Sequence, residues 1–546
     1  MHPVVAIVQE RLRRIEREPF YATMGELLAD AARRDPDRLA IVFFERGQQL
    51  TYAGLDRAVN RAANALVAIG VRRGDRVAVM LPNRLEYPVT WLALARIGAA
   101  MIPVNNGYTP REIAYATTDG GASFAVVDET CMATFLAAPE RPAALTDDRI
   151  VVVGTSPVGG TRSWEQLIAS ARDSFTPAEP VTGDDPIGIQ YTSGTTGLPK
   201  GCLLPQSYWL VLCRSASART TSQVRRLLVQ NLFFYMNAQF LLLTALNIGA
   251  TLYMAERPSA TRFIGWIKEI GANWCIFPEV VLKQPAAFDD NRTALSEVAM
   301  AAVSRDGHRE IERRFNVRAR EIFGMTEVGP GTFMPFEVED MVGSGSIGAP
   351  SLFRRARIRG PEGQEVALGD PGELQITGPS MLKLYVNKPE ATARSFDGEW
   401  FRTGDVARQD EQGFFYIVGR IKDMIRRGGE NIAAVEIESV VRHLPGVIDA
   451  AVTAVPDETR GEEVRITIER EAGEGVAREA GDAALLRAII AHCEANLARF
   501  KIPRYYAFAD TLPRTASNKL AKHQIVAAGS DPRAGTFDRI DGIWRP

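Results

Sequence analysis

Residues 191–201 read YTSGTTGLPKG, a loop rich in hydroxyls and glycines that ends in a lysine. Glycines let backbone N–H groups approach a bound anion closely, and serine and threonine hydroxyls can donate to phosphate oxygens. A solvated turn is the plain alternative, because the same residue types are common in loops. The dense interleaving of both types, closed by Pro-Lys-Gly, favours a polyphosphate-binding loop. Its candidate residues are Thr192, Ser193, Gly194, Thr195, Thr196, Gly197 and Lys200.

Other motifs of this general kind fail on their context. In the Walker A pattern glycine directly precedes the lysine, whereas Pro199 precedes Lys200 here. Residues 343–348, GSGSIG, have the spacing of a dinucleotide fingerprint, but Pro350 interrupts where a helix must begin. No serine has the two flanking glycines of a nucleophile elbow. Walker-type, nicotinamide, flavin and serine hydrolase chemistry are therefore disfavoured.

Composition limits the class of protein and its partners. The 546 residues, 46% of them hydrophobic, are too many for one core, so two or more domains are expected. Lys+Arg 64 against Asp+Glu 66 leaves a net charge of −2, which gives no footprint for nucleic acid or an anionic membrane. The five cysteines and five histidines show neither a disulfide framework nor zinc spacing. Free cysteines of this kind predict a cytoplasmic protein.

The N-terminus and the most apolar stretch predict no membrane segment. The apolar run near the N-terminus is too short for a secretory signal. Residues 240–255 are shorter than the roughly 20 residues of a spanning helix, so we interpret them as a buried helix and strand.

Alternating strand-like and helical patterns predict an α/β fold. Strand-like runs at 39–44, 76–81, 149–154 and 186–191 alternate with amphipathic helices, which favours helix-covered, mainly parallel sheets. The polyphosphate loop then follows a strand and precedes the helical run after Leu203. Short strands separated by Gly, Pro and Asp at about 343–420 predict a small antiparallel sheet or barrel. The remainder, 421–546, mixes helices and strands as a separate α+β unit, with a surface loop near 471–484.

Four further segments suit nucleotide chemistry in combination. FGMTE (323–327) joins an aromatic platform to a carboxylate, and WFRTGD (400–405) ends in Asp405, whose carboxylate could accept from two ribose hydroxyls. GRIKDMIRRGGEN (419–431) supplies two cations and a glycine pair, and LPRTASNK (512–519) places Lys519 in a polar loop. Each alone is also compatible with an ordinary turn or linker.

These motifs, in this order and at these spacings, resemble the adenylate-forming superfamily of acyl-CoA synthetases, nonribosomal adenylation domains and luciferases. The resemblance covers about residues 20–525, and the RRGGENI and GSGSIGAP segments are most similar to carnitine/crotonobetaine-type and medium-chain CoA ligases. It implies an AMP-binding N-terminal domain, 1–420, built from two stacked helix-covered sheets and a small β-barrel at about 343–420. A small mobile α+β C-terminal domain, 421–546, would carry the catalytic lysine.

The resemblance also implies a reaction and residue roles. A carboxylate attacks the α-phosphate of Mg-ATP to give acyl-AMP and pyrophosphate, and the thiol of coenzyme A then displaces AMP. Lys519 matches the catalytic lysine, and Thr326 and Glu327 match the α-phosphate contact and the magnesium ligand, with Thr196 as a second metal contact. The nucleotide positions are Phe323 with Gly324 at the adenine, Asp405 and Arg420 at the ribose, and Gly429 at the pantetheine tunnel; Lys422 matches the hinge.

The acyl pocket implied by the resemblance involves Tyr235, Asn237, Phe277, Val328 and Gly329. Its apolar bias predicts a hydrophobic or cyclic acid. Some positions depart from the commoner pattern: Tyr235 stands where many relatives have histidine, Asn518 where glycine is usual, and Asn431 where acetate-specific relatives have arginine. A glycine-rich turn is replaced by MAAVSRDG, which bears on substrate choice more than on catalysis.

The leading hypothesis is an ATP-dependent acid:CoA ligase acting as a monomer or homodimer. A stand-alone enzyme that loads a carrier protein stays open, as do a luciferase-like oxygenase and a non-catalytic nucleotide-binding relative. The presence of Lys519, Glu327 and Asp405 disfavours the last of these.

Overall fold

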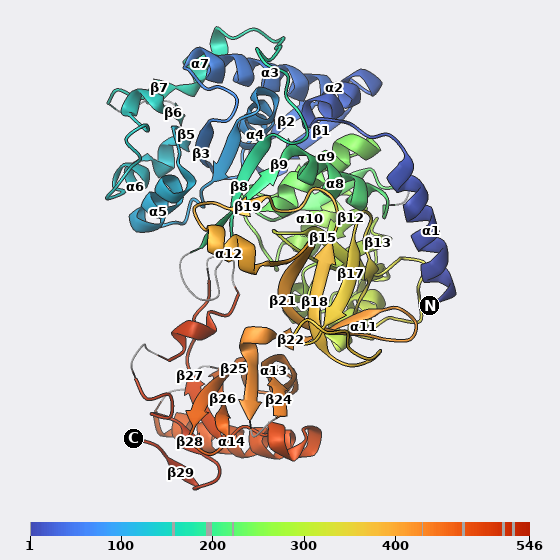
Figure 1. Cartoon of the computed structure of the whole chain (residues 1–546), viewed down its shortest axis with the longest axis vertical. Helices are drawn as coiled ribbons and strands as arrows, with labels where there is room; N and C mark the ends of the chain where they lie inside the picture. Colours follow the sequence, from blue (N-terminus) through green and yellow to red (C-terminus); the bar gives the residue numbers. More distant parts are fainter. Residues whose placement is uncertain are drawn as a thin grey trace.

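In this computed structural model, residues 2–154, 159–192, 199–220, 223–427, 430–471, 475–515, 519–526 and 530–546 are described, without the side chains of 422, 430, 431 and 475–480. Figure 1 shows a large N-terminal unit and, at one end of it, a smaller C-terminal unit coloured orange to red. Among the described residues, none of the helices combines the length and the apolar character that crossing a membrane requires.

The largest sheet has a parallel half and an antiparallel half. Its path runs through β17 (Arg355–Arg359), β18 (Gly372–Thr377), β21 (Trp400–Gln409), β22 (Phe415–Arg420), β16 (Ser346–Pro350), β15 (Gly329–Phe333), β14 (Arg318–Met325), β13 (Glu297–Met300), β12 (Trp274–Ile276), β10 (Arg226–Val229), β11 (Thr251–Met254), β1 (Leu39–Phe43) and β2 (Gln48–Thr51). β14 is the junction, because it pairs parallel with β13 and antiparallel with β15. The predicted small antiparallel sheet at 343–420 is present, and hydrogen bonds join it to the parallel sheet.

A second sheet carries the strand that precedes the polyphosphate loop. Its order is β19 (Leu384–Tyr385), β9 (Lys200–Pro205), β8 (Pro186–Thr192), β4 (Ala100–Pro103), β3 (Arg76–Met80), β5 (Phe124–Asp128), β6 (Ile150–Val153) and β7 (Arg162–Ser163). The sequence predicted that a helical run follows the loop. Instead, the chain first forms β9, which pairs antiparallel with β8. The loop is therefore the connection of a β-hairpin.

Helices fill the space between these sheets and cover their outer faces. They are α2 (Met24–Arg34), α3 (Tyr52–Ala68), α4 (Glu86–Ile97), α5 (Pro110–Gly120), α6 (Met132–Leu136), α7 (Trp164–Ala169), α8 (Gln206–Ser217), α9 (Met236–Ile248), α10 (Phe263–Ile270), α11 (Arg305–Phe315) and α12 (Pro389–Arg394). α9 is apolar on all sides, as a helix buried between two layers must be, and α4 and α8 pack in the same core. The predicted buried helix and strand at 240–255 are confirmed as α9 and β11.

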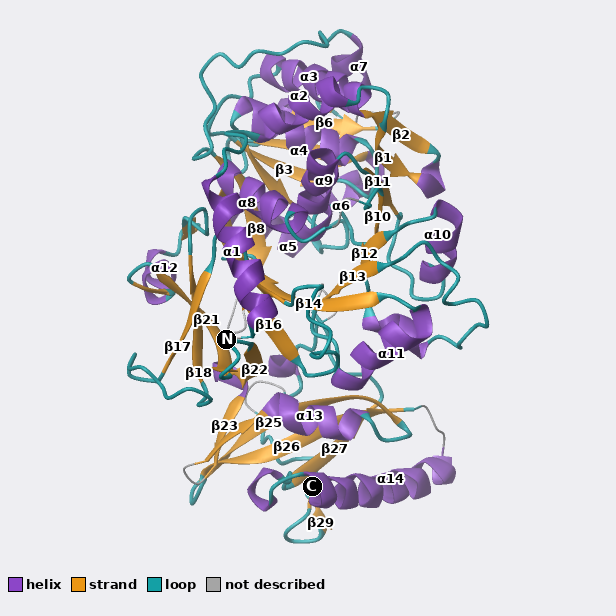
Figure 2. Cartoon of the chain, turned by 90° about the vertical axis from the view of Figure 1, so that its right-hand side faces the viewer, coloured by secondary structure: helices purple, strands orange, loops and turns teal. Residues whose placement is uncertain are grey.

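The N-terminal helix α1 (Pro3–Arg17) lies along the antiparallel half of the larger sheet (Figure 2). Val5, Val8 and Leu12 are buried against residues of that half, including Phe333 and Phe414. The side chain of Arg214 on α8 donates to the backbone oxygens of Ile15 and Glu18, which fixes the end of α1.

The C-terminal unit is a sheet covered by two helices. Its strands are β23 (Met424–Arg427), β24 (Glu430–Ala433), β25 (Val447–Asp457), β26 (Gly461–Arg470), β27 (Tyr505–Ala509), β28 (Phe537–Asp538) and β29 (Ile543–Trp544), and its helices are α13 (Ala434–Arg442) and α14 (Gly475–Asn496). The prediction of a surface loop to residue 484 is wrong, because α14 begins at Gly475. Buried Leu486, Ile489 and Cys493 anchor this helix to the sheet, and tertiary packing of this kind overrides a loop-like composition.

Candidate functional site

The described ends of the polyphosphate loop are held by the hairpin and by two tyrosines. Thr192 pairs with Lys200 across β8 and β9, and the Tyr115 hydroxyl donates to the backbone oxygen of Pro199 at 2.7 Å. The Nζ atom of Lys200 lies 4.0 Å from the ring centroid of Tyr385. The predicted loop residues Ser193, Gly194, Thr195, Thr196 and Gly197 lie outside the described residues. Both anchored ends thus belong to β-sheet backbone.

The FGMTE segment occupies the turn from β14 to β15. A β-carbon at Gly324 would lie 2.5 Å from the backbone oxygen of Gly329, so this close approach requires glycine. A β-carbon at Gly331 would lie 2.9 Å from Cδ1 of Phe323, so Gly331 leaves the space that this ring uses. Phe323 is half-buried, and an aromatic ring of this kind is able to stack on a flat ligand.

Glu327 is buried and has a fixed hydrogen-bond partner. Its exposed fraction is 6%, and its Oε1 accepts from the Tyr385 hydroxyl at 2.8 Å. Burial and the neighbouring Glu327 charge raise the pKa of Tyr385 well above its ordinary value, so the hydroxyl stays a donor at neutral pH. The hydroxyl of Thr326 donates to the sulfur of Met236 at 3.6 Å, which brings this turn to the beginning of α9.

Asp405 and Arg420 face each other across β21 and β22. Arg420 Nε lies 2.7 Å from Asp405 Oδ1, while Asp405 Oδ2 is buried and has no hydrogen-bond partner among the described residues. Burial raises the pKa of Asp405, and the nearby charge of Arg420 offsets part of that rise. An unpartnered buried carboxylate oxygen is costly. It fits a ligand that brings hydroxyl donors, as a ribose does.

Lys519 reaches this site from the C-terminal unit. Its charge lowers the pKa of Asp405 and the charge of Glu327 raises it, so Asp405 lies within electrostatic reach of both residues. The Lys519 side chain is exposed, and its backbone N–H and C=O are both bonded to Thr515. The predicted lysine of the C-terminal unit and the predicted Asp405 of the N-terminal unit therefore interact electrostatically.

Ion pairs hold both stems of the Lys519 loop. Before the lysine, Arg514 lies 2.6 Å from Asp449 Oδ2; after it, Lys522 Nζ lies 2.7 Å from Glu438 Oε1. Leu512 N–H donates to Glu469 Oε2 at 3.1 Å. These contacts attach the loop to β25, β26 and α13.

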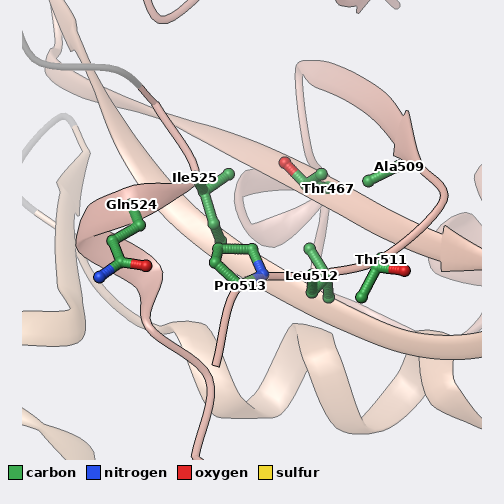
Figure 3. A pocket seen from close by; sticks show the side chains of 7 residues that line it. All are labelled: Thr467, Ala509, Thr511, Leu512, Pro513, Gln524 and Ile525. Carbon is green, nitrogen blue, oxygen red and sulfur yellow. The ribbon is translucent and has the colours of Figure 1, made fainter. Parts of the chain in front are cut away.

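A small pocket opens between the two stems of that loop (Figure 3). It is lined by Thr467, Ala509, Thr511, Leu512, Pro513, Gln524 and Ile525. Its polar lining residues are Thr467, Thr511 and Gln524, and the buried Thr467 hydroxyl has no hydrogen-bond partner within the part of the chain that the structure describes. The pocket lies beside the support of Lys519 and is separate from the nucleotide residues.

The predicted acyl-pocket residues are divided between surface and core. Tyr235 and Asn237 are half-buried at the beginning of α9, whereas Val328 and Gly329 are buried. Phe277 is 1% exposed and packs against Phe263 and Phe315, so its ring is not brought to a surface site. Sequence periodicity does not distinguish a core aromatic from a pocket aromatic at the end of a buried strand.

Glu321, two residues before Phe323, was not singled out from the sequence. Its Oε1 accepts from Ala302 N–H at 2.5 Å, and Ala302 has a left-handed φ of 56°. Burial raises the pKa of Glu321 to about 7, with backbone donors acting in the opposite direction. Glu321 therefore fixes the turn at 302–304 that replaces a glycine-rich one. The strand that contains Glu321 begins with the charged sequence RARE, so no local pattern distinguished this residue.

The remaining predicted positions lie largely outside what the structure describes. Gly429 and Asn518 are not among the described residues, and the side chains of Lys422 and Asn431 are not described. Within the described residues, no group of three or more His, Cys, Asp or Glu could hold a metal ion.

Comparison with known proteins gives matches over nearly the whole chain. Residues 28–386 match the AMP-binding enzyme family, and residues 436–519 match the AMP-binding enzyme C-terminal domain. The chain is 33% identical to feruloyl-CoA synthase of Amycolatopsis sp (92% of this chain, 98% of that protein). It is 31% identical to crotonobetaine/carnitine–CoA ligase of Proteus mirabilis (90% and 96%). ATP-bound MatB from Rhodopseudomonas palustris has a similar structure, with a TM-score of 0.79 at 27% identity (91% and 97%).

Proposed function

We propose where and on which acids this protein acts, given that the chain belongs to the AMP-binding enzyme family and is an ATP-dependent acid:CoA ligase. The proposed substrate is a hydrophobic or aromatic carboxylic acid, and the proposed site lies around Asp405, Glu327 and Lys519. The observation that carries the site is the buried Oδ2 of Asp405, which lies beside Arg420 and has no hydrogen-bond partner among the residues that the structure describes. The carboxylate of the acid attacks the α-phosphate of ATP and pyrophosphate leaves, and the CoA thiol then displaces AMP.

The first step brings one anion to another, and cations from both units offset the repulsion. Lys519 would bridge the acid carboxylate and the α-phosphate, where a preorganised cation stabilises developing charge. Lys200 and the hydroxyls of the polyphosphate loop hold the β- and γ-phosphates. Thr326 donates to the α-phosphate, and Phe323 with Gly324 supports the adenine.

Mg²⁺ is proposed to bind through Glu327, with Thr196 as a second contact. Glu327 is buried and Tyr385 occupies its Oε1, which leaves Oε2 for a hard cation. A single carboxylate is a fitting ligand, because Mg²⁺ usually binds one or two carboxylates together with substrate phosphates. When bound, the ion neutralises phosphate charge. Glu327 contributes the fixed negative charge, and Tyr385 holds that carboxylate in place.

The second step is proposed to use a different orientation of the C-terminal unit. Rotation about Lys422 would withdraw Lys519 and bring Gly429 to the CoA pantetheine. The present structure has Lys519 near Asp405, which is the arrangement that the first step needs.

The acid is proposed to bind beside the beginning of α9, near Tyr235 and Asn237. Thr326 contacts Met236 there, so the α-phosphate side and the acid side adjoin. The relatives named above act on feruloyl and crotonobetaine or carnitine groups, respectively. The apolar side chains of Met236 and Val328, close to this position, favour a hydrophobic or aromatic acid.

A pyrophosphate-release assay over a panel of aliphatic and aromatic acids, with and without CoA, tests this function. We expect release that depends on a hydrophobic acid, with acyl-CoA as the product. Adenylate formation without a CoA thioester would instead indicate loading of a carrier protein. Absence of acid-dependent pyrophosphate with every acid would contradict both.

A further inference from the structure

Tyr385 contacts both halves of the candidate phosphate site. Its hydroxyl donates to Glu327 Oε1 at 2.8 Å, and its ring carries Lys200 Nζ at 4.0 Å from the centroid. Glu327 lies in the turn between β14 and β15 of one sheet, and Lys200 begins β9 of the other. One side chain, only 2% exposed, therefore touches the candidate metal ligand and the loop lysine.

The backbone around Tyr385 is bound to the same two elements. Leu382 N–H donates to the backbone oxygen of Glu327 at 2.8 Å, and Val386 N–H donates to that of Gly201 at 2.8 Å. Strand β19 pairs with β9, with Tyr385 opposite Cys202. The ring and hydroxyl are thus fixed relative to both partners before any ligand binds.

Each contact has a chemical effect on the group that it touches. A hydrogen bond to a carboxylate is charge-assisted and directional, so it orients the Glu327 side chain. A ring face attracts an ammonium group, most strongly where water is excluded. Tyr385 holds Lys200 without neutralising it, and the ammonium keeps its charge for phosphate.

We propose that Tyr385 is a positioning residue that aligns Glu327 for Mg²⁺ through its hydroxyl and Lys200 for the phosphates through its ring. This inference rests on the proposed function. Two variants separate the role of the hydroxyl at Glu327 from the role of the ring at Lys200. Tyr385→Phe removes only the hydroxyl, whereas Tyr385→Leu removes the ring as well.

The test is a Mg²⁺ titration of two properties: ATP-induced thermal stabilisation and acid-dependent pyrophosphate release. For Tyr385→Phe we expect the half-effective Mg²⁺ concentration to rise about tenfold in both, which is the scale of one hydrogen bond to a charged group. For Tyr385→Leu we expect an additional rise, about three- to tenfold, in the ATP concentration needed at saturating Mg²⁺.

Tyr416→Phe is the matched control. The Tyr416 hydroxyl donates to Asp410 Oδ2 at 2.8 Å, and Arg408 lies 4.2 Å from its ring centroid, so it loses the same kind of contact away from the site. Its Mg²⁺ and ATP dependences should equal those of the wild type.

A double-mutant cycle with Glu327→Gln excludes a general loss of folding. If Tyr385 acts through Glu327, adding Tyr385→Phe to Glu327→Gln changes the Mg²⁺ response little. A wild-type Mg²⁺ response in Tyr385→Phe, or an undiminished effect of that change in the Glu327→Gln background, would overturn the inference. Failure of the proposed function is seen separately, as ATP binding by the wild type without acid-dependent pyrophosphate.

Discussion

The carboxylates of the nucleotide site and the loop that carries Lys519 are built in opposite ways. Asp405 and Glu327 are 3% and 6% exposed, lie on or between sheet strands, and have fixed partners in Arg420 and Tyr385. Lys519 is exposed on a loop of another unit and is positioned through ion pairs at its stems. The fixed carboxylates suit a nucleotide that stays bound through both adenylation and thioester formation. A lysine on a separate unit can move away after adenylation, so it suits the first step only.

Removal of the Lys519 charge should have the largest effect. For Lys519→Ala we expect acid-dependent ATP–pyrophosphate exchange to fall about 100- to 1,000-fold, because Lys519 is the cation that we propose to bridge the acid carboxylate and the α-phosphate. Lys501→Ala is the control: Lys501 is a cation of the same unit that pairs with Glu436 instead. Exchange at the wild-type rate in Lys519→Ala would remove the lysine from the first step.

Neutralising the buried carboxylate should have the next largest effect. Asp405→Asn takes the charge from Arg420 and an acceptor from the ribose, so we expect the KM for ATP to rise about 10- to 100-fold. In the control, Asp397→Asn breaks an exposed pair with Arg357, at 2.5 Å, and should leave the KM unchanged. Equal ATP dependence in the two variants would show that Asp405 does not face the nucleotide.

Loosening the lysine loop should have a smaller effect, confined to one step. Arg514→Gln breaks the pair with Asp449 at the first stem, and we expect the kcat of adenylation to fall about three- to tenfold with little change in the KM for ATP. Arg533→Gln changes an exposed arginine elsewhere in the unit and serves as the control. A change in the ATP KM alone would place Arg514 at the nucleotide and not at the loop.

The smallest expected effect concerns stability and Glu321. Its folded pKa of about 7 exceeds the ordinary value of 4.5, so the folded form binds the proton more tightly. Folding stability should therefore fall as the pH rises from about 4.5 to 7, by about 1–3 kcal/mol, where the upper figure is the full linkage value of the shift. Glu321→Gln should lack that dependence in thermal melts over this pH range. Parallel melting curves for both proteins would contradict the assignment.

Local patterns predicted several strands and their alternation with helices. Strands β1, β3, β6 and β8 follow the expected apolar runs closely, because buried parallel strands have continuous apolar sequence. β9 was missed, since its first residues belong to the loop motif and only pairing with β8 makes them a strand.

Contacts between distant residues were beyond the sequence. The Tyr385–Glu327 bond joins a two-residue strand to a turn in another sheet, and no period or motif indicates it. The same holds for the core position of Phe277, where α10 and α11 rather than local sequence decide which way the ring faces. Residues chosen by motif were therefore easier to predict than the residues that support them.

The central claim is that Asp405 and Glu327 are fixed for both steps, whereas Lys519 acts only in the first. It is tested most directly by supplying the acyl-AMP intermediate. Wild-type and Lys519→Ala proteins are mixed with preformed acyl-AMP and CoA, and acyl-CoA formation is followed in a single turnover. We expect the variant, inactive in adenylation, to form the thioester at a rate within about threefold of the wild type, because Lys519 serves only the first step. An equal loss of both half-reactions would contradict the division.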